Sequence, residues 1–164
     1  MVGAIAQFMA TDHRRLEALL DRATAGPDIV DAELFEQFRA GLLRHIALEE
    51  KVLLPAIRDA QGGNGHPMAG QLRLDHGAIA AMLVPTPTLA GVSRLRLLLE
   101  QHDEIEERAG GVYDNCDSAL APVAAELLNR LKAYPNVRTA PHVDGPLVER
   151  HIQESLERAG RLAS

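Results

Sequence analysis

One short pattern occurs twice in this 164-residue chain, and it restricts the fold more than any other feature. An Asp-His pair at 12–13 is followed, after a break, by the segment HIALEE at 45–50. The same order returns with an Asp-His pair at 75–76 and the segment HDEIEE at 102–107. Histidine and glutamate four residues apart lie on one face of an α-helix. The repeat therefore predicts two similar helical hairpins, each of which contributes half of one site.

Glycine and proline divide the chain into helical stretches, and no segment alternates apolar and polar residues for long enough to predict a sheet. We expect helices near 3–24, 28–60, 67–84, 88–109, 119–133 and 146–159. This pattern predicts an all-α protein, an up-down-up-down four-helix bundle with additional C-terminal helices.

We expect a single domain over residues 1–164, with a metal-binding bundle at 1–117 and a C-terminal helical extension at 118–164. Pro55 falls inside the second expected helix. It should kink that helix at a cost of about 3 kcal/mol unless packing compensates.

Each of the first four expected helices has one face that is apolar except near its middle. Steps of three and four residues trace these faces. On the second helix, the face runs from Phe35 through Leu42 to Val52. Histidine and glutamate interrupt the four faces at six positions, which are His13, His45, Glu49, His76, His102 and Glu106.

These polar groups need compensation, because burying an unpaired carboxylate is prohibitive and burying an imidazole is costly. A metal ion balances the carboxylate charge and accepts the histidine lone pairs, and bundle cores are a usual place for such ligands. Six ligands suit two ions better than one. If Glu49 and Glu106 both bridge, each ion receives two carboxylate oxygens and two histidines. A buried polar network without metal is the alternative.

One known family has this pattern of ligands on four helices. The chain resembles the hemerythrin, or HHE, family over about residues 1–110, through His13, His45-xxx-Glu49, His76 and His102-xxx-Glu106. The resemblance implies two iron ions bridged by carboxylates and by an oxo or hydroxo group. Imidazole and carboxylate donors together suit iron, with manganese or zinc as alternatives. Members of the family carry or sense oxygen, or handle nitric oxide, peroxide or iron.

The chain departs from the invertebrate oxygen carriers of that family in two places. The carriers have a fifth histidine one turn before the ligand of the third helix, where this chain has Leu72. They also have an aspartate five residues after the histidine of the fourth helix, whereas here Glu106 follows His102 by four residues. Loss of the fifth histidine makes the two metals more alike and leaves more open coordination. Binding or sensing is therefore preferred to simple reversible oxygen carriage.

The acidic residues beside the expected ligands have two interpretations each. Asp12 and Asp75 precede ligand histidines, and they either lie on the surface or accept the remaining N–H of a histidine on an adjacent helix. Glu50 and Glu107 point about 100° away from the ligand face. We expect both to be exposed to solvent, with support of the site as the alternative.

The other residues capable of chemistry lie off these faces or at their ends. His66 and His151 are expected on the surface, and His142 is expected to pack within an irregular loop. Tyr113 would end the face of the fourth helix, where core packing is expected and a hydrogen bond towards the site is the alternative. Cys116 is expected to be an inert small side chain.

Composition argues against several other classes of protein. The net charge is −6, with acidic and basic residues interspersed, so no nucleic-acid partner is expected. No apolar run approaches a membrane span, and the first residues lack the features of a secretory signal. The chain has one cysteine, so no disulfide forms within it. These features lead us to expect a cytoplasmic protein without a membrane partner.

Three hypotheses about function follow from the sequence. The preferred one is a non-haem di-iron protein that binds or senses oxygen, nitric oxide or peroxide, or handles iron. The second is an enzyme that reduces peroxide or nitric oxide at the same centre, and the third is a structural or regulatory partner that the metal only stabilises. No nucleophile–base pair or phosphate loop is found, so no catalytic side chain is predicted. The expected partner is a diatomic or peroxide ligand, and the C-terminal helices offer a surface for a homodimer.

Overall fold

The structure is a computed structural model that describes residues 2–161. In that part of the chain all regular structure is helical and there is no strand, so the predicted all-α fold is confirmed. None of the described helices is long and apolar enough to span a membrane. The helical elements, in chain order, are α1 (Ala4–Ala23), α2 (Ala32–Leu48), a π-helical turn (Glu49–Leu53), α3 (Leu54–Ala60), α4 (Ala69–Met82), α5 (Leu89–Glu107), α6 (Val112–Leu120), a 3-10 turn (Ala121–Val123), α7 (Ala124–Ala133) and α8 (Pro146–Ala159).

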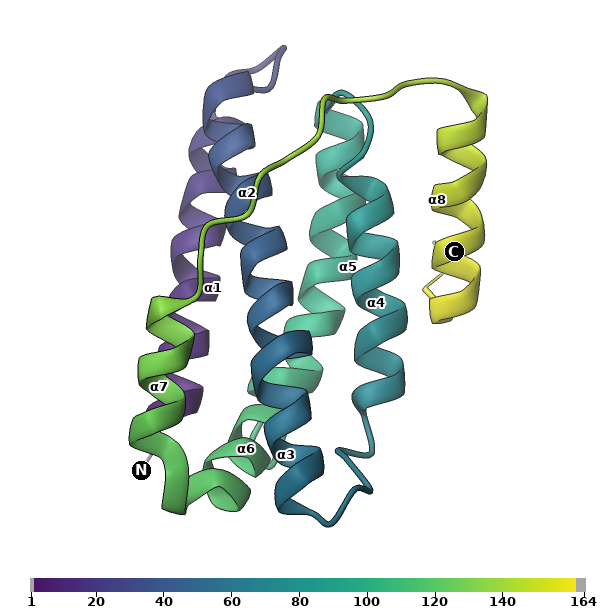
Figure 1. Cartoon of the computed structure of the whole chain (residues 1–164). Helices are drawn as coiled ribbons and strands as arrows, with labels where there is room; N and C mark the ends of the chain where they lie inside the picture. The colour runs from purple at the N-terminus through teal and green to yellow at the C-terminus, as the bar shows by residue number, and fades with distance from the viewer. Residues whose placement is uncertain (1, 162–164) are drawn as a thin grey trace.

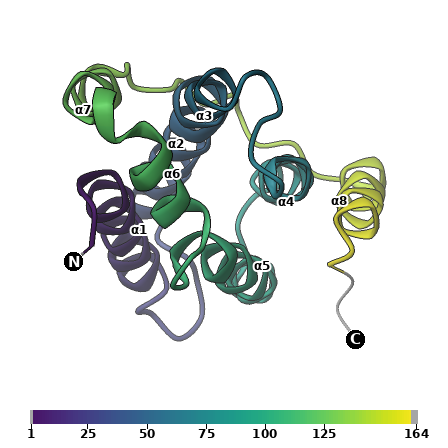
Figure 2. The ribbon, with the colours of Figure 1, turned by 90° about the horizontal axis from the view of Figure 1, so that it is seen from below.

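Four long segments form the bundle, namely α1, α2 continued by α3, α4, and α5 (Figure 1). Consecutive segments run in alternating directions, which agrees with the predicted up-down-up-down order. Seen from below, α6 lies across the lower end of the bundle (Figure 2). Helix α7 packs beside α1, and α8 packs against the outer side of α4.

The apolar core has an upper and a lower part, separated along the bundle axis. On α1, Met9 belongs to the lower part and Leu16 to the upper part. On α4, Leu72 belongs to the lower part and Ile79 to the upper part. The expected ligand histidines fall between these positions on each helix, so the fold places them in one layer.

Pro55 is accommodated by a change of helix type. A π-helical turn spans Glu49–Leu53, and Leu54 donates its N–H to the carbonyl of Glu49. Pro55 then stands in the first turn of α3, where a helix does not need the N–H that proline lacks. The predicted interruption is therefore present. It begins at an expected ligand, which fits the frequent occurrence of π-turns at functional sites.

Helix α6 is absent from the sequence-based prediction, and it changes the position of Tyr113. Gly110 has a φ of 71°, a left-handed conformation that favours glycine, so α5 ends before it. The helix expected at 119–133 begins later, as α7 at Ala124, because its first residues belong to the end of α6 and to the 3-10 turn. Tyr113 therefore lies on α6, and its assignment to the face of the fourth helix is wrong.

Two helices begin at acidic caps. Asp31 caps α2, which starts later than the expected position near residue 28. Asp117 of α6 caps α1, because its carboxylate oxygens accept the N–H groups of Ile5 and Ala6 at 2.9 Å each. The second cap joins segments far apart in sequence and anchors α6 against the bundle.

Candidate metal centre

The six expected ligands form one buried layer between the two parts of the core, and the most exposed of them, His13, is only 6% exposed. Their donor atoms fall into two groups, and within each group the atoms lie within 4.8 Å of one another. The first group consists of His13, His45, Glu49 and Glu106. The second group consists of Glu49, His76, His102 and Glu106. The structure thus brings all six residues together, with both glutamates shared between the groups.

Each shared glutamate turns one oxygen towards each group. Oε1 of Glu49 lies 3.4 Å from Nε2 of His45, and Oε2 of Glu49 lies 2.9 Å from Nε2 of His76. Oε2 of Glu106 lies 3.5 Å from Nε2 of His13 on α1, and Oε1 of Glu106 lies 3.2 Å from Nε2 of His102 on α5. Carboxylates placed in this way could bridge two ions.

Every one of these histidines has an acidic partner from another helical segment on its second nitrogen, Nδ1. The pairs are Asp12 with His45 at 2.8 Å, Glu50 with His76 at 2.8 Å, Asp75 with His102 at 3.2 Å, and Glu107 with His13 at 2.5 Å. Such partners fix the orientation of the ring and direct Nε2 to the centre.

The expected solvent exposure of Glu50 and Glu107 is therefore wrong. Their side chains are only 28% and 20% exposed. Each points away from the ligand face of its own helix, but a neighbouring helix places a histidine there. For Asp12 and Asp75, the structure agrees with the alternative in which they bind a histidine.

Asp75 connects the centre to the C-terminal extension. Its side chain is fully buried, and Arg161 contacts both of its oxygens, at 3.0 Å through Nε and 3.1 Å through Nη2. Gln71 adds a hydrogen bond of 3.0 Å. The corresponding Asp12 is bound instead by Arg15 of its own helix at 2.8 Å. Residues after α8 thus support one half of the centre, a role that the sequence did not indicate.

In the metal-free protein, protons balance the charge of the centre. Burial lowers the pKa of His45, but the charge of Glu49 and the hydrogen bond to Asp12 raise it to about 10. Burial likewise acts against ionisation of Glu49, yet the charge on His45 holds the pKa of Glu49 well below its usual value. Burial and the nearby charge of Glu49 raise the pKa of Glu106. A metal ion that binds here takes the place of these protons.

Three donor atoms of the centre fit a bound cation especially well. Oε2 of Glu49, Nε2 of His76 and Oε1 of Glu106 are buried and have no hydrogen-bond partner among the described residues. The first two atoms are 2.9 Å apart but do not have hydrogen-bonding geometry. A buried polar atom without a partner costs about 1–3 kcal/mol. An ion would satisfy all three, and this mixture of imidazole and carboxylate suits iron, manganese or zinc.

Tyr113 enters the centre from α6. Its hydroxyl donates to a carboxylate, with Oε1 of Glu49 at 2.5 Å and Oε2 of Glu106 at 2.9 Å. It also lies 3.2 Å from Nε2 of His13 and 3.3 Å from Nε2 of His45. The expectation of core packing alone is therefore incomplete, and the alternative of a hydrogen bond towards the site is the one observed.

The remaining histidines and the cysteine lie outside the centre. His151 is exposed, and His66 is half-buried in its loop, where it accepts the N–H of Met68 at 3.0 Å. His142 is half-buried in the irregular segment before α8, in agreement with loop packing. Cys116 is fully buried, and burial raises the pKa of its thiol to about 12, as an inert side chain requires.

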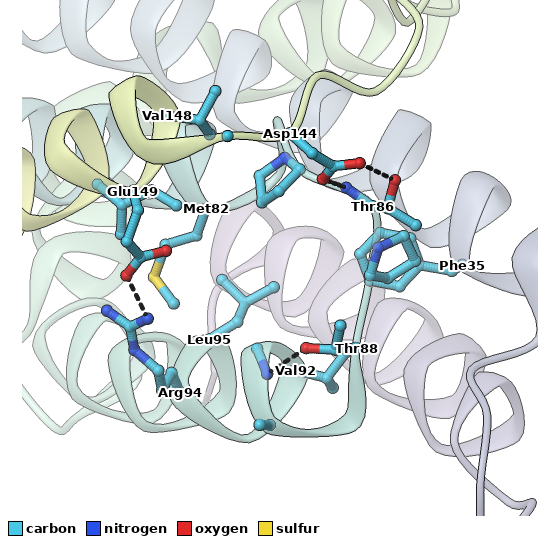
Figure 3. Close-up of a pocket in the computed structure, with 16 residues that line it drawn as sticks. Phe35, Met82, Thr86, Thr88, Val92, Arg94, Leu95, Asp144, Val148 and Glu149 are labelled. Atoms are coloured by element: carbon cyan, nitrogen blue, oxygen red, sulfur yellow. Dashed lines mark hydrogen bonds and ion pairs between the residues drawn. The ribbon is translucent and has the colours of Figure 1, made fainter.

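A cavity of about 320 Å³ lies between α8, α5 and the loop before α5 (Figure 3). Its floor is apolar and includes Met82 and Leu95. The polar groups at its rim are paired with each other, Asp144 with Thr86 at 2.7 Å and Arg94 with Glu149 at 2.9 Å. None of the six expected ligands lines this cavity, so it is not part of the candidate metal centre.

The fold and the centre define a helical-bundle protein whose core holds a histidine and carboxylate cluster able to bind metal cations. Residues 4–84, about half of the chain, match the hemerythrin HHE cation-binding domain. The chain belongs to this family. The match includes the ligand positions on α1, α2 and α4 and ends before α5, where His102 and Glu106 complete the pattern. No significant match is found with a curated protein or with a solved structure.

Proposed function

We propose that this protein is a non-haem di-iron protein that binds or senses a small oxidant (oxygen, nitric oxide or peroxide) or handles iron. One observation carries the proposal, which is that Glu49 and Glu106 are shared by two buried donor groups, each completed by two histidines. Membership of a cation-binding family supports it. The mixture of imidazole and carboxylate donors suits iron, manganese or zinc, and iron is preferred because the resemblance to hemerythrins implies it.

The protein residues would play distinct parts in such a centre. His13 and His45 would hold one ion, His76 and His102 the other, and the two glutamates would bridge them. This leaves each ion with four protein donors and with open positions for a small ligand. The acidic partners on Nδ1 keep the four rings oriented. The iron itself supplies redox change and affinity for small oxidants.

An opening beside the centre has the size and lining expected for a small ligand. It is a cavity of about 80 Å³ between α1, α2 and α5, with Leu16, Leu20 and Phe38 in its wall. His13 and Asp103 also line it, and Oδ1 of Asp103 lies 3.8 Å from Nε2 of His13. Pockets for organic ligands measure roughly 300–1,000 Å³. The opening combines apolar side chains with charged ones such as Glu17 and Arg96, and its small size favours a diatomic molecule or peroxide.

Metal analysis of the purified, iron-loaded protein tests the proposal. We expect about two irons per chain and visible absorption that changes when nitric oxide or peroxide is added. Glu49→Ala should lose both properties, and Glu104→Ala, which changes an exposed glutamate of α5, should keep them. Less than one tightly bound iron per chain without a visible band would contradict the proposal. Repeated consumption of peroxide with an electron donor would identify an enzyme instead of a binding protein.

A further inference from the structure

The two halves of the centre differ in one respect that the repeated sequence pattern conceals. The hydroxyl of Tyr113 lies 2.5–3.3 Å from one donor atom of each member of the first group, the one with His13 and His45. These four atoms are paired across that group, Oε2 of Glu106 with Nε2 of His13 and Oε1 of Glu49 with Nε2 of His45, so they would face an ion bound there. The hydroxyl therefore occupies the position between them.

Among residues 2–161, no hydroxyl occupies the second half in this way. The three buried donor atoms without a hydrogen-bond partner, on Glu49, Glu106 and His76, all face this half. The same two glutamates thus have one satisfied oxygen, facing Tyr113, and one unsatisfied oxygen, facing His76 or His102.

This difference has a direct energetic consequence. In either half an ion replaces close histidine–glutamate contacts, but in the half at His76 and His102 it breaks no hydrogen bond of Tyr113 and supplies partners to atoms that lack them. An ion in the other half must displace the hydroxyl of Tyr113, whose side chain is only 1% exposed and packs in the lower part of the core. Hydrogen bonds to charged groups are the stronger ones, so this displacement opposes binding.

Support from the C-terminal extension adds to the asymmetry. Asp75, which orients His102, is held by Arg161 and Gln71 and is fully buried. Asp12, which orients His45, is held by the exposed Arg15. His102 of the second half is therefore more firmly placed before metal binds than His45 of the first.

We infer that the two halves bind metal unequally and in a defined order. The first ion binds tightly at His76 and His102, and the hydroxyl of Tyr113 keeps the place of the second ion until it is displaced. This inference rests on the proposed function and makes it more specific, because Tyr113 then sets whether the protein holds one metal or two.

Zinc titration of the metal-free protein, followed by equilibrium dialysis, tests this order. The wild type should bind one zinc tightly and a second at least about tenfold more weakly, because the second breaks hydrogen bonds to charged groups. Tyr113→Phe should strengthen the second equivalent by about the same factor and leave the first unchanged. His76→Ala should remove the tight equivalent, whereas His13→Ala should remove the weak one.

Tyrosine fluorescence provides a second measurement that leaves Tyr113 intact. The chain contains no tryptophan and two tyrosines, so in Tyr134→Phe the emission comes from Tyr113 alone. This variant also serves as the matched control, and it should bind both ions as the wild type does. The first equivalent of zinc should change the emission little. The second should produce most of the change, because the hydroxyl then leaves the carboxylates.

The possible results separate the inference from the proposed function. Equal affinity for both ions in the wild type, or a Tyr113→Phe variant with unchanged binding, would overturn the inference and leave a two-metal centre. Loss of the second ion in Tyr113→Phe would also overturn it, because Tyr113 would then be a ligand. A wild-type protein that takes up neither zinc nor iron tightly would refute the proposed function itself.

Discussion

Replacing Arg161 with alanine should destabilise the metal-free protein far more than a surface substitution does. Arg161 is 18% exposed and contacts both oxygens of Asp75, which is fully buried. Burial acts against ionisation of Asp75, but hydrogen bonds from His102, Arg161 and Gln71 lower its pKa to about 2. Asp75 therefore stays charged at neutral pH. Without Arg161 it remains buried with fewer partners.

The size of the effect follows from these contacts. Removing one partner of a fully buried ion pair costs about 3–5 kcal/mol, and a hydrogen bond to a charged group contributes about 1.5–3 kcal/mol. Because Arg161 is partly exposed and Asp75 keeps His102 and Gln71, we expect a loss of about 2–3 kcal/mol in the free energy of unfolding. For a chain of this length, that lowers the melting temperature by roughly 5–10 °C.

The matched control is Arg94→Ala. This substitution removes the ion pair between Arg94 of α5 and Glu149 of α8. Arg94 lies 2.9 Å from Glu149, but their side chains are 40% and 61% exposed, so the loss should stay below about 1 kcal/mol. Urea unfolding of both metal-free variants, followed by circular dichroism, measures the difference. If Arg161→Ala is no less stable than Arg94→Ala, Asp75 does not depend on the C-terminal arginine and the reasoning fails.

Three further predictions concern other parts of the molecule. Because the pKa of Cys116 is raised to about 12, its thiol is protonated at pH 8 and should resist iodoacetamide in the folded protein, reacting only after unfolding; rapid labelling would contradict its burial. Gly111→Ala should lower the melting temperature, because the new Cβ would meet backbone carbonyl oxygens at 2.7–2.8 Å, whereas Gly70→Ala, with open space, should raise it slightly. His45 is protonated in the metal-free protein up to a pH of about 10, so metal uptake at pH 7 should release protons and strengthen as the pH rises; calorimetry in buffers of different ionisation enthalpy would show this, and a heat independent of buffer would argue against it.

The six residues of the candidate centre could be picked out from the sequence because the information that marks them is local. Helical periodicity of three to four residues decides which side chains share a face. A histidine or glutamate such as His45 or Glu49 on an otherwise apolar face is therefore visible without any knowledge of the partner helices. Other local signals, namely the glycine and proline breaks and the lack of alternating segments, predicted the all-α fold, the order of the four bundle segments and the interruption at Pro55.

The supporting residues could not be predicted in this way. Glu50 and Glu107 point away from the ligand face of their own helices, and only the packing of neighbouring helices places histidines beside them. Tyr113 reaches the centre because Gly110 ends α5 and lets α6 turn across the bundle.

Arg161 likewise meets Asp75 across 86 residues of chain. The sequence by itself thus determined which residues form the buried polar layer. Only the tertiary structure decided which side chains orient those residues and which hydroxyl occupies one half of the centre. The physical reason is that hydrogen bonds between helices depend on distances in space, and helical periodicity carries no information about those distances.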